Sequence, residues 1–320
     1  ANTPAQSVAS NIYNPSPLPV VTGARLSPRK ANEITLRSMA VADTMSILND
    51  RVLFTIGGRH QRVEQDVFST ATGLKTSSYG SEAYTPLAAL VVKPLQNVSL
   101  YANYAEGLSQ GIIVPANFAN RGEVLAPYKS KQQEAGVKVD WGTITTTAAV
   151  FQIARPLLIT TAANVRTYGG EQTNRGLELN AYGLLMPGLR GMVSATFLKP
   201  EITKSVNPLE IGNDAAGMPD KTFSGSLDWD TPWVTGLSLN GRVIYTSGAY
   251  LTNLNLAWQR FSDWTRVDLG ARYATSFNGR PVTIRANIEN VAGANYWLTT
   301  GSFVTVGSPR TYMLSAAFDF

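Results

Sequence analysis

The sequence predicts an all-β fold, an antiparallel meander of the transmembrane β-barrel type. Its composition suits strands, its connections alternate between short and long, and its strands have one apolar and one polar face. Charged residues make up 15% and hydrophobic residues 44% of the 320 residues. Thr, Ser, Asn and Gly fill the difference, which favours strands and turns over helices. No run approaches the ~18 consecutive apolar residues of a membrane helix.

The composition excludes several kinds of site. The chain has no cysteine, which rules out disulfides and thiolate metal sites. His60 is the single histidine, so neither a histidine metal cluster nor a catalytic residue is predicted. The net charge of +5 comes from scattered basic residues, whereas nucleic-acid binding requires them on one face. The chain is therefore predicted not to be an enzyme and not to bind nucleic acid.

Period-2 alternation of apolar and polar residues marks about thirteen candidate strands. They lie near residues 34–46, 51–64, 84–93, 97–107, 130–141, 143–154, 174–185, 190–202, 221–231, 237–249, 264–275, 281–291 and 309–320. Residues 1–32 are predicted to be a loop-like segment leading into the first strand, and residues 33–320 to form the β-domain.

The connections between these strands predict the architecture. Short, turn-like ones lie around Asn49-Asp50, Pro94-Leu95, Gly142, Pro187-Gly188, Thr231-Pro232 and residues 276–281. The alternate connections are longer, roughly 13 to 24 residues against the usual ~4–6. One end of the meander is therefore tight and the other carries large loops, which is typical of transmembrane β-barrels.

The two faces of the strands support a membrane setting. In TRVDLGARYA (265–274), Val267, Leu269, Ala271 and Tyr273 alternate with Arg266, Asp268, Gly270 and Arg272. In a soluble sandwich the apolar face is the core, but these apolar sets are rich in small residues that fill a core poorly. If the pairing of a strand shifted by one residue, an Arg of the polar face would face lipid. This would cost about 2–4 kcal/mol of folding free energy near the bilayer midplane. Aromatic residues at strand ends, among them Trp141, Trp233 and Trp264, are predicted to form interfacial girdles.

Several segments together resemble TonB-dependent ferric-siderophore receptors of the bacterial outer membrane. They are SLYANYAEGLSQG (99–111), YKSKQQEAGVKVDWG (128–142), GEQTNRGLELNAYG (170–183), GRPVTIRANIENVAGANYW (279–297) and GSPRTYMLSAAFDF (307–320). The resemblance implies uptake of ferric siderophores energised by the TonB complex, with no covalent cofactor. It also implies a plugged barrel of about 22 strands, so the chain is expected to be the C-terminal part of a longer receptor that includes the plug and about nine more strands.

The last strand carries a further resemblance. Tyr312, Phe318 and Phe320 share one face, and the chain ends on a Phe, like the signal that outer-membrane proteins present to the barrel-assembly machinery. Besides this machinery and TonB, outer-membrane lipid is an expected partner. Two alternatives stay open: a passive porin-type channel of about 14 strands, and a soluble β-sandwich or propeller that serves as a binding module.

Ligand binding is predicted in the long loops. Aromatic and arginine side chains suit siderophores through stacking, cation–π and charge-assisted contacts. The candidates are Phe118, Tyr128, Arg155, Arg166, Tyr168, Tyr250, Trp258, Arg260, Tyr296, Trp297 and Phe303. The alternative is that these aromatic residues form the outer girdle or pack loop against loop. Charges on the polar faces, such as Arg266, Asp268 and Glu289, are expected to form ion pairs between strands or to contact a plug.

Overall fold

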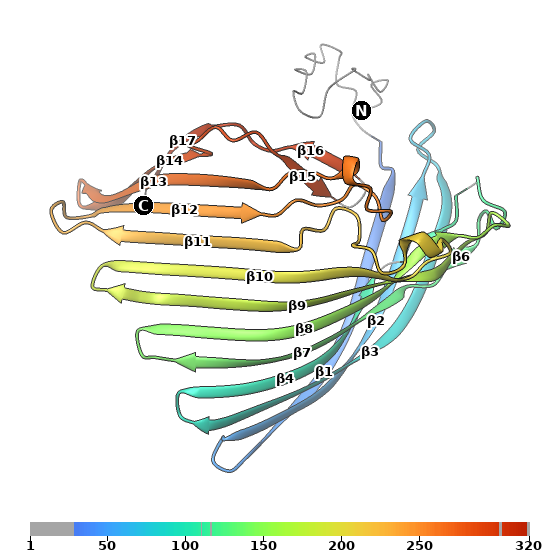
Figure 1. Ribbon diagram of the computed structural model, residues 1–320, viewed down its shortest axis with the longest axis horizontal. Helices are drawn as coiled ribbons and strands as arrows, with labels where there is room; N and C mark the ends of the chain where they lie inside the picture. The colour runs from blue at the N-terminus through green and yellow to red at the C-terminus, as the bar shows by residue number, and fades with distance from the viewer. Residues whose placement is uncertain (1–28, 110, 116, 301–302, 319–320) are drawn as a thin grey trace. The chain divides into compact units, whose positions relative to one another are not determined.

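The computed structural model describes residues 29–109, 111–115, 117–300 and 303–318. Within these residues, thirteen strands form one antiparallel sheet in the order β1-β2-β3-β4-β7-β8-β9-β10-β11-β12-β13-β14-β17 (Figure 1). Their bounds are β1 (Asn32–Ile47), β2 (Val52–Phe68), β3 (Lys75–Leu95), β4 (Val98–Ser109), β7 (Tyr128–Asp140), β8 (Ile144–Thr160), β9 (Arg166–Met186), β10 (Leu189–Lys204), β11 (Lys221–Asp230), β12 (Leu237–Thr246), β13 (Trp264–Phe277), β14 (Arg280–Glu289) and β17 (Thr311–Phe318). The all-β, antiparallel prediction is confirmed.

Small elements lie in the connections. β5 (Ile112–Ile113) pairs with β6 (Val124–Leu125), and β15 (Trp297–Thr300) pairs with β16 (Phe303–Val306). Two 3₁₀ helices are described, η1 (Pro208–Glu210) and η2 (Ala257–Gln259). None of the helices in the described part of the chain is long and apolar enough to cross a membrane. The predicted loop-like segment 1–32 lies outside the described residues except for its last four positions.

The chain divides into two compact units, residues 1–39 with 60–83 and residues 40–59 with 84–320. In the first unit, β2 and β3 are joined by side chains: Lys75 Nζ lies 2.6 Å from Asp66 Oδ1, and Ser78 Oγ donates to the same oxygen at 2.7 Å. The second unit contains β4 to β17 and all candidate ligand-binding residues. Its strands from β4 onward follow one another side by side (Figure 1).

Connections of the second unit gather at two ends. The turn side has 96–97, 141–143, 187–188, 231–236 and 278–279, and the loop side has 110–127, 161–165, 205–220, 247–263 and 290–310. Between β13 and β14, Asn278 and Gly279 both have positive φ, 52° and 77°. Two such residues in a two-residue hairpin are the type I′ pattern that matches the twist of the strands. The predicted tight end is therefore confirmed.

Two of the predicted long loops are short in the structure. β9 begins at Arg166 and β8 continues to Thr160, which leaves only 161–165 between them, and β3 begins at Lys75, which leaves 69–74 after β2. The prediction was wrong here because apolar alternation marks only the part of a strand with an apolar face. On the loop side, β9 continues through residues such as Thr173 and Asn174 that are polar on both faces.

The register confirms the predicted faces. On β12 and β13, Val243 lies opposite Val267, while Arg242 lies opposite Asp268. Side chains that share the parity of Val243 form the outward face, and those that share the parity of Arg242 form the inward face. Outward side chains stay exposed, for example Leu227 at 51% and Leu269 at 49%. No second layer of described protein covers them, which a soluble sandwich would require.

The aromatic residues at the strand ends divide between the two faces. Trp141 and Trp233 are 65% and 63% exposed on the turn side, as an interfacial girdle requires. Trp264 is different, because it shares the parity of Arg266 and stacks on Tyr296 with ring centroids 4.3 Å apart. Trp264 therefore belongs to the inward face, and its assignment to a girdle was wrong.

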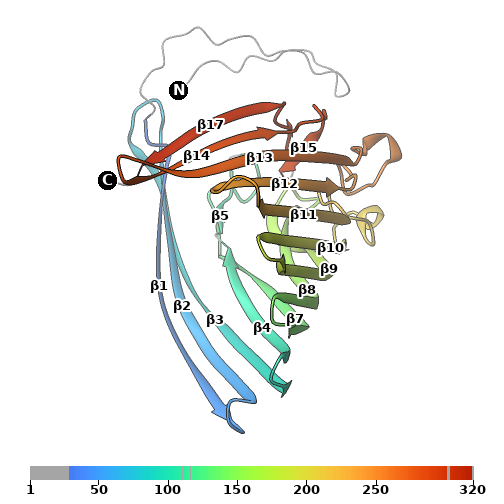
Figure 2. The same ribbon diagram turned by 90° about the vertical axis from the view of Figure 1, so that its left-hand side faces the viewer.

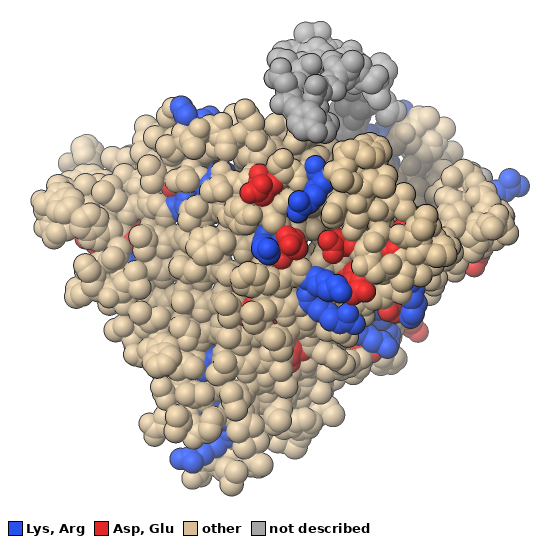
Figure 3. Space-filling model, viewed as in Figure 1, with Lys and Arg blue, Asp and Glu red and all other residues tan. Residues whose placement is uncertain are grey.

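The second unit is curved across its strands. In Figure 2, β8 to β12 lie farthest to one side, and β4, β14 and β17 lie back from them. Figure 1 therefore views this part of the sheet from its convex side, and Figure 3 shows few charged side chains there except toward the loop side.

Candidate ligand-binding site on the loop side

A first cluster of aromatic and arginine side chains joins loop 110–127 to β7 and β9. The guanidinium carbon of Arg166 lies 5.4 Å from the centre of the Phe118 ring, and the rings of Tyr128 and Tyr168 are 5.2 Å apart. Four of the predicted residues, Phe118, Tyr128, Arg166 and Tyr168, therefore take part in ring contacts on the loop side. Arg166, also among the candidates, supplies the guanidinium of this cluster.

Asparagine side chains hold the first cluster in place. Asn120 Nδ2 donates to the Arg166 carbonyl at 2.8 Å, and Asn120 Oδ1 accepts from the Arg166 N–H at 2.9 Å. Asn164, with φ of 56°, donates from Nδ2 to the Asn117 carbonyl at 3.0 Å. A side-chain amide can replace two missing backbone partners at once. The two loops are therefore tied together at the level of their backbones.

Arg155 has a different environment from the one predicted. Its Nε and Nη2 both donate to Gln172 Oε1, at 3.2 and 2.8 Å. Gln172 is only 2% exposed and in turn donates to Asn174 at 2.8 Å. This pairing anchors the guanidinium on β9, so Arg155 offers a ligand fewer free N–H groups than an unpaired arginine would.

A second cluster joins loops 247–263 and 290–310. The guanidinium carbon of Arg260 lies 5.6 Å from the centre of the Tyr250 ring, and the two residues form an isolated β-bridge. Phe261 and Trp297 have ring centroids 6.4 Å apart. Trp258 is 73% exposed on η2. Trp258 and Arg260 are therefore the predicted residues of this cluster that a ligand can reach directly.

Tyr296 plays a different part from its sequence neighbour Trp297. It is only 6% exposed, because it stacks on Trp264 and lies under the loop. Its hydroxyl accepts from Arg266 Nη1 at 3.5 Å. Tyr296 thus supports the loop and presents little surface to a ligand.

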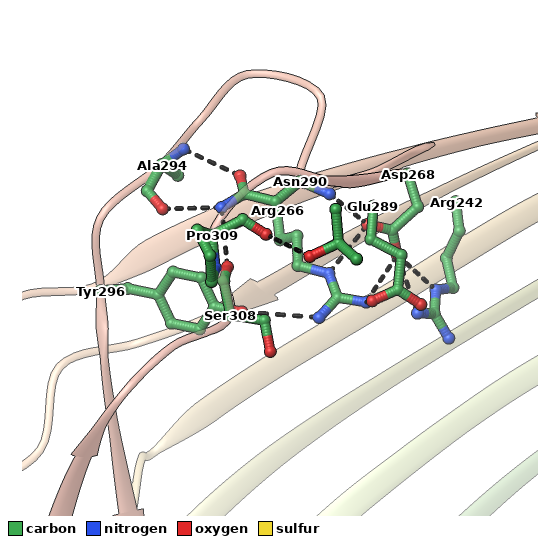
Figure 4. A network of polar contacts seen from close by, with 10 residues as sticks. Arg242, Arg266, Asp268, Glu289, Asn290, Ala294, Tyr296, Ser308 and Pro309 are labelled. Carbon is green, nitrogen blue, oxygen red and sulfur yellow. Dashed lines mark hydrogen bonds and ion pairs between the residues drawn. The ribbon is translucent and has the colours of Figure 1, made fainter. Parts of the chain in front are cut away.

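A polar network lies beneath the second cluster (Figure 4). Arg266 donates to Asp268 at 2.8 and 2.9 Å and lies 3.3 Å from Glu289. Arg242 donates to Asp268 at 2.7 Å from the neighbouring strand. The expectation of ion pairs between strands is confirmed for these residues. A hollow of about 490 Å³ on this part of the sheet is lined by Arg190, Asp228, Arg242, Asp268 and Glu289, among others.

Asn290 connects this network to the last loop (Figure 4). It is fully buried, and its N–H donates to Asp268 Oδ1 at 2.8 Å. Its side chain donates to the carbonyls of Ala294 and Ser308 at 2.8 and 3.1 Å and accepts from the Ala294 N–H at 2.8 Å. One amide therefore holds both arms of the loop. Asn290 is not among the predicted site residues, and its only signal in the sequence is an Asn near the end of a predicted strand.

Reciprocal asparagine contacts also join loops 205–220 and 247–263. Asn255 Oδ1 accepts from the Asp214 N–H at 2.8 Å and Asn255 Nδ2 donates to the Asp214 carbonyl at 2.9 Å. Asn213 Nδ2 donates to the Asn253 carbonyl at 2.8 Å. Burial, together with repulsion from Asp220, raises the pKa of the Asp214 carboxyl. Thr299 donates to the Gly217 carbonyl at 2.7 Å, which attaches the β15–β16 hairpin to the same group of loops.

No group of His, Asp or Glu side chains among the described residues could hold a metal ion. On β17, Tyr312 and Phe318 are 69% and 53% exposed on the outward face. Phe320, the third residue of the predicted assembly signal, lies outside the described residues.

Comparison with known proteins decides the family. The family model described as TonB dependent receptor-like, beta-barrel, matches residues 3–291. The chain belongs to this family. Members of this family are outer-membrane receptors and not enzymes. The predicted family and the predicted outer-membrane location are therefore confirmed, and the two alternatives, a porin-type channel and a soluble binding module, are excluded.

The relatives are siderophore receptors. The chain is 35% identical to the ferrichrome receptor FcuA of Yersinia enterocolitica, over 97% of this chain and 42% of that protein. It is 27% identical to the ferrioxamine B receptor of Salmonella typhimurium, over 92% of this chain and 42% of that protein. The crystal structure of BauA, the ferric preacinetobactin receptor of Acinetobacter baumannii, superposes with a TM-score of 0.76 at 36% identity and covers 90% of this chain and 43% of that one. The chain thus spans less than half the length of the relatives that it matches.

Proposed function

We propose that this chain is part of an outer-membrane receptor that takes up ferric siderophores, with energy supplied through TonB. The proposed cargo is a siderophore of the hydroxamate or ferrichrome-like class. The names of the relatives support the substrate class, and the family supports the coupling. The iron arrives wrapped by its chelator, so the receptor needs groups that bind the chelate surface and no metal ligands of its own.

The observation that carries the proposal is the pair of aromatic and arginine clusters on the loop side. Trp258 and Arg260 are both exposed and two residues apart in sequence, and Phe118, Tyr128 and Tyr168 belong to the other cluster. Flat rings bind the apolar parts of a chelate by stacking, and guanidinium groups bind its carbonyl oxygens or negative charge. Because Asn120, Asn255 and Asn290 fix the loops, these groups are held ready, which lowers the entropy cost of binding.

The whole receptor requires more strands than this chain contributes. In the described residues, β1 and β17 are the two edges of the sheet. Unpaired backbone in lipid costs several kcal/mol per group, so we infer that further strands pair with both edges and that a plug fills the lumen. TonB would act on that plug region, and the barrel-assembly machinery would read the strand that carries Tyr312, Phe318 and Phe320.

Uptake by cells tests this function. A strain that lacks the gene for the whole protein should lose accumulation of radioactive iron supplied as ferrichrome or ferrioxamine B, and the gene on a plasmid should restore it. Restored uptake should disappear in a strain without TonB. Uptake that continues at the parental rate in the deletion strain would refute the proposal, provided that no second receptor for the same chelate is present.

The residues of the site are tested separately in the full-length protein. Trp258→Ala and Arg260→Ala should each weaken binding of the ferric siderophore about tenfold, which corresponds to about 1.4 kcal/mol. Trp233→Ala is a matched control, because Trp233 is 63% exposed on the turn side. Equal affinity in the parent, the loop-side variants and the control would remove Trp258 and Arg260 from the site.

A further inference from the structure

The tripeptide Asn-Gly-Arg occurs twice in the chain, at residues 240–242 and 278–280. The first copy lies within β12, and the second forms the turn between β13 and β14. An asparagine that precedes glycine loses its side-chain ammonia readily, because glycine has no Cβ to shield its backbone nitrogen. The two copies have the same local chemistry, so a difference in their reactivity would come from the fold.

The second copy lies at a hairpin tip beyond the described pairing of the neighbouring strands. The described pairs of β13 with β12 end at Tyr273, and those of β14 with β17 begin at Val282. Residues 276–281 have described strand pairs only within their own hairpin. Because a hairpin of two strands is at best marginally stable in water, this tip can open locally while the rest of the sheet stays paired.

The turn itself is uncovered in the described part of the structure. Asn278 and Gly279 are both exposed, and a Cβ added to Gly279 would meet no atom within 4 Å. Among the described residues, no hydrogen bond involves the Asn278 side chain or the Gly279 N–H. Pro281 has no N–H to donate to a neighbouring strand. Water and the Gly279 nitrogen can therefore both approach the Asn278 side chain once the turn opens.

The first copy is held from both sides. Asn240 lies opposite Asp228 of β11 and Gly270 of β13, and Gly241 is likewise paired on both sides. The Asn240 side chain lies over Gly270, where an added Cβ would be only 2.5 Å from its Oδ1. To bring the Gly241 nitrogen onto the Asn240 side-chain carbon, the backbone must rotate and leave two neighbouring strands at once.

We propose that Asn278 is a site of spontaneous deamidation with water as the co-reactant. The Gly279 nitrogen attacks Cγ of Asn278 and forms a C–N bond. The bond from Cγ to Nδ2 breaks, and Nδ2 leaves as ammonia with the proton that Gly279 gives up. Water then opens the five-membered imide at one of its two carbonyl carbons. Opening at Cγ gives aspartate, and opening at the backbone carbonyl carbon gives isoaspartate.

The reaction changes the turn in charge and in length. Both products place a carboxylate next to Arg280, and isoaspartate adds one carbon to the main chain of a two-residue turn in which both φ angles are positive. The change should stay local, because the tip lies beyond the described pairs with β12 and β17. In an outer-membrane barrel the short turns lie in the periplasm, so the modification would accumulate there with the age of the receptor. The proposal does not depend on which ligand the loops bind.

Full-length receptor in lipid nanodiscs provides the test. It is incubated for weeks at mildly alkaline pH, which favours loss of the Gly279 proton, and is then digested and analysed by mass spectrometry. Enzymatic methylation distinguishes isoaspartate from aspartate. Asn278 should deamidate at least about tenfold faster than Asn240, because the hairpin tip opens at a lower free energy than the paired sheet. In receptor unfolded in guanidinium chloride, the two asparagines should react at similar rates.

The control variant is Asn278→Gly, because glycine also adopts positive φ. It should remove the signal from the turn and leave Asn240 unchanged. Equal rates at Asn278 and Asn240 in nanodiscs, or no deamidation of Asn278 in nanodiscs while the unfolded receptor reacts, would overturn the proposal. A rate difference of the same size in guanidinium chloride would assign it to local sequence and not to the fold, and would overturn the proposal as well.

Discussion

The outward and inward faces of the second unit are built by opposite rules. Outward side chains such as Leu227, Leu269 and Leu314 are exposed. Inward side chains are polar and tied to one another, as Arg190 is to Asp228 at 3.1 Å and to Asp230 at 2.6 Å. The outward face needs only an apolar surface, whereas the inward face needs specific partners.

This difference teaches where each face is sensitive to change. A substitution on the outward face acts through the surrounding lipid, so its effect depends on polarity and depth. A substitution on the inward face acts through named neighbours, because it leaves buried donors and acceptors without partners.

The largest effect is expected when charge is placed on the outward face. Leu314 and Met313 are consecutive residues of β17 that point to opposite faces, opposite Ala286 and Asn287. In the full-length protein, Leu314→Arg should cost about 2–4 kcal/mol of folding free energy, because the guanidinium faces hydrocarbon. Met313→Arg should cost clearly less, because it faces a polar interior. Denaturant titration in lipid vesicles measures both, and equal costs would contradict the assignment of the faces.

A smaller but more local effect is expected at Asn290. Removal of its amide in Asn290→Ala leaves the Ala294 N–H and the Ala294 and Ser308 carbonyls without their partner. Each buried group left unpaired costs about 1–3 kcal/mol. Hydrogen exchange of residues 290–310 should become faster, with little change in the strands.

Two further variants sharpen this result. Asn290→Asp keeps an acceptor for the Ala294 N–H but loses both donated hydrogen bonds, so it should resemble Asn290→Ala. Asn287→Ala is the control, because Asn287 lies on β14, three residues before Asn290, and its side chain makes no described hydrogen bond. Faster exchange in Asn287→Ala to the same extent would show that Asn290 has no special role in holding the loop.

The contrast between the faces also explains what the sequence could predict. A period-2 pattern identifies Val267 and Leu269 as outward because hydrocarbon imposes the same requirement along every strand. This alternation stops where the apolar face of a strand stops, so the loop-side parts of β3 and β9 were not predicted as strand. Those segments stay in the sheet through pairing with their neighbours, which no local pattern records.

The candidate site could be predicted only in part for a related reason. Trp258 and Arg260 could be predicted as candidates because aromatic and basic residues in a loop are residue types that suit a siderophore. The burial of Tyr296 and the clamp of Asn290 depend on which residues far along the chain come together, such as Asp268 and Ser308. Contacts of this kind follow from register and loop packing, and single residue types do not reveal them.

The smallest effect is expected at Asp214, between loops 205–220 and 247–263. Burial, and then the charge of Asp220, raise the pKa of the Asp214 carboxyl, so its charged form weakens the folded loops. The loss of folding free energy caused by the charged carboxylate is fully present above the raised pKa. It disappears as the pH falls through that pKa, which lies above the ordinary value of 3.8. Asp214→Asn should therefore slow hydrogen exchange of these loops slightly at neutral pH, after correction for the intrinsic exchange rate.

The same variant should also flatten the pH dependence of that protection. Its backbone contacts to Asn255 involve the Asp214 N–H and carbonyl, so the amide variant keeps them. Asp263→Asn removes the same charge from an exposed position in loop 247–263 and should change neither the protection nor its pH dependence. If Asp214→Asn exchanges faster than the parent at neutral pH, the carboxylate stabilises the loops and the direction argued from its burial is wrong.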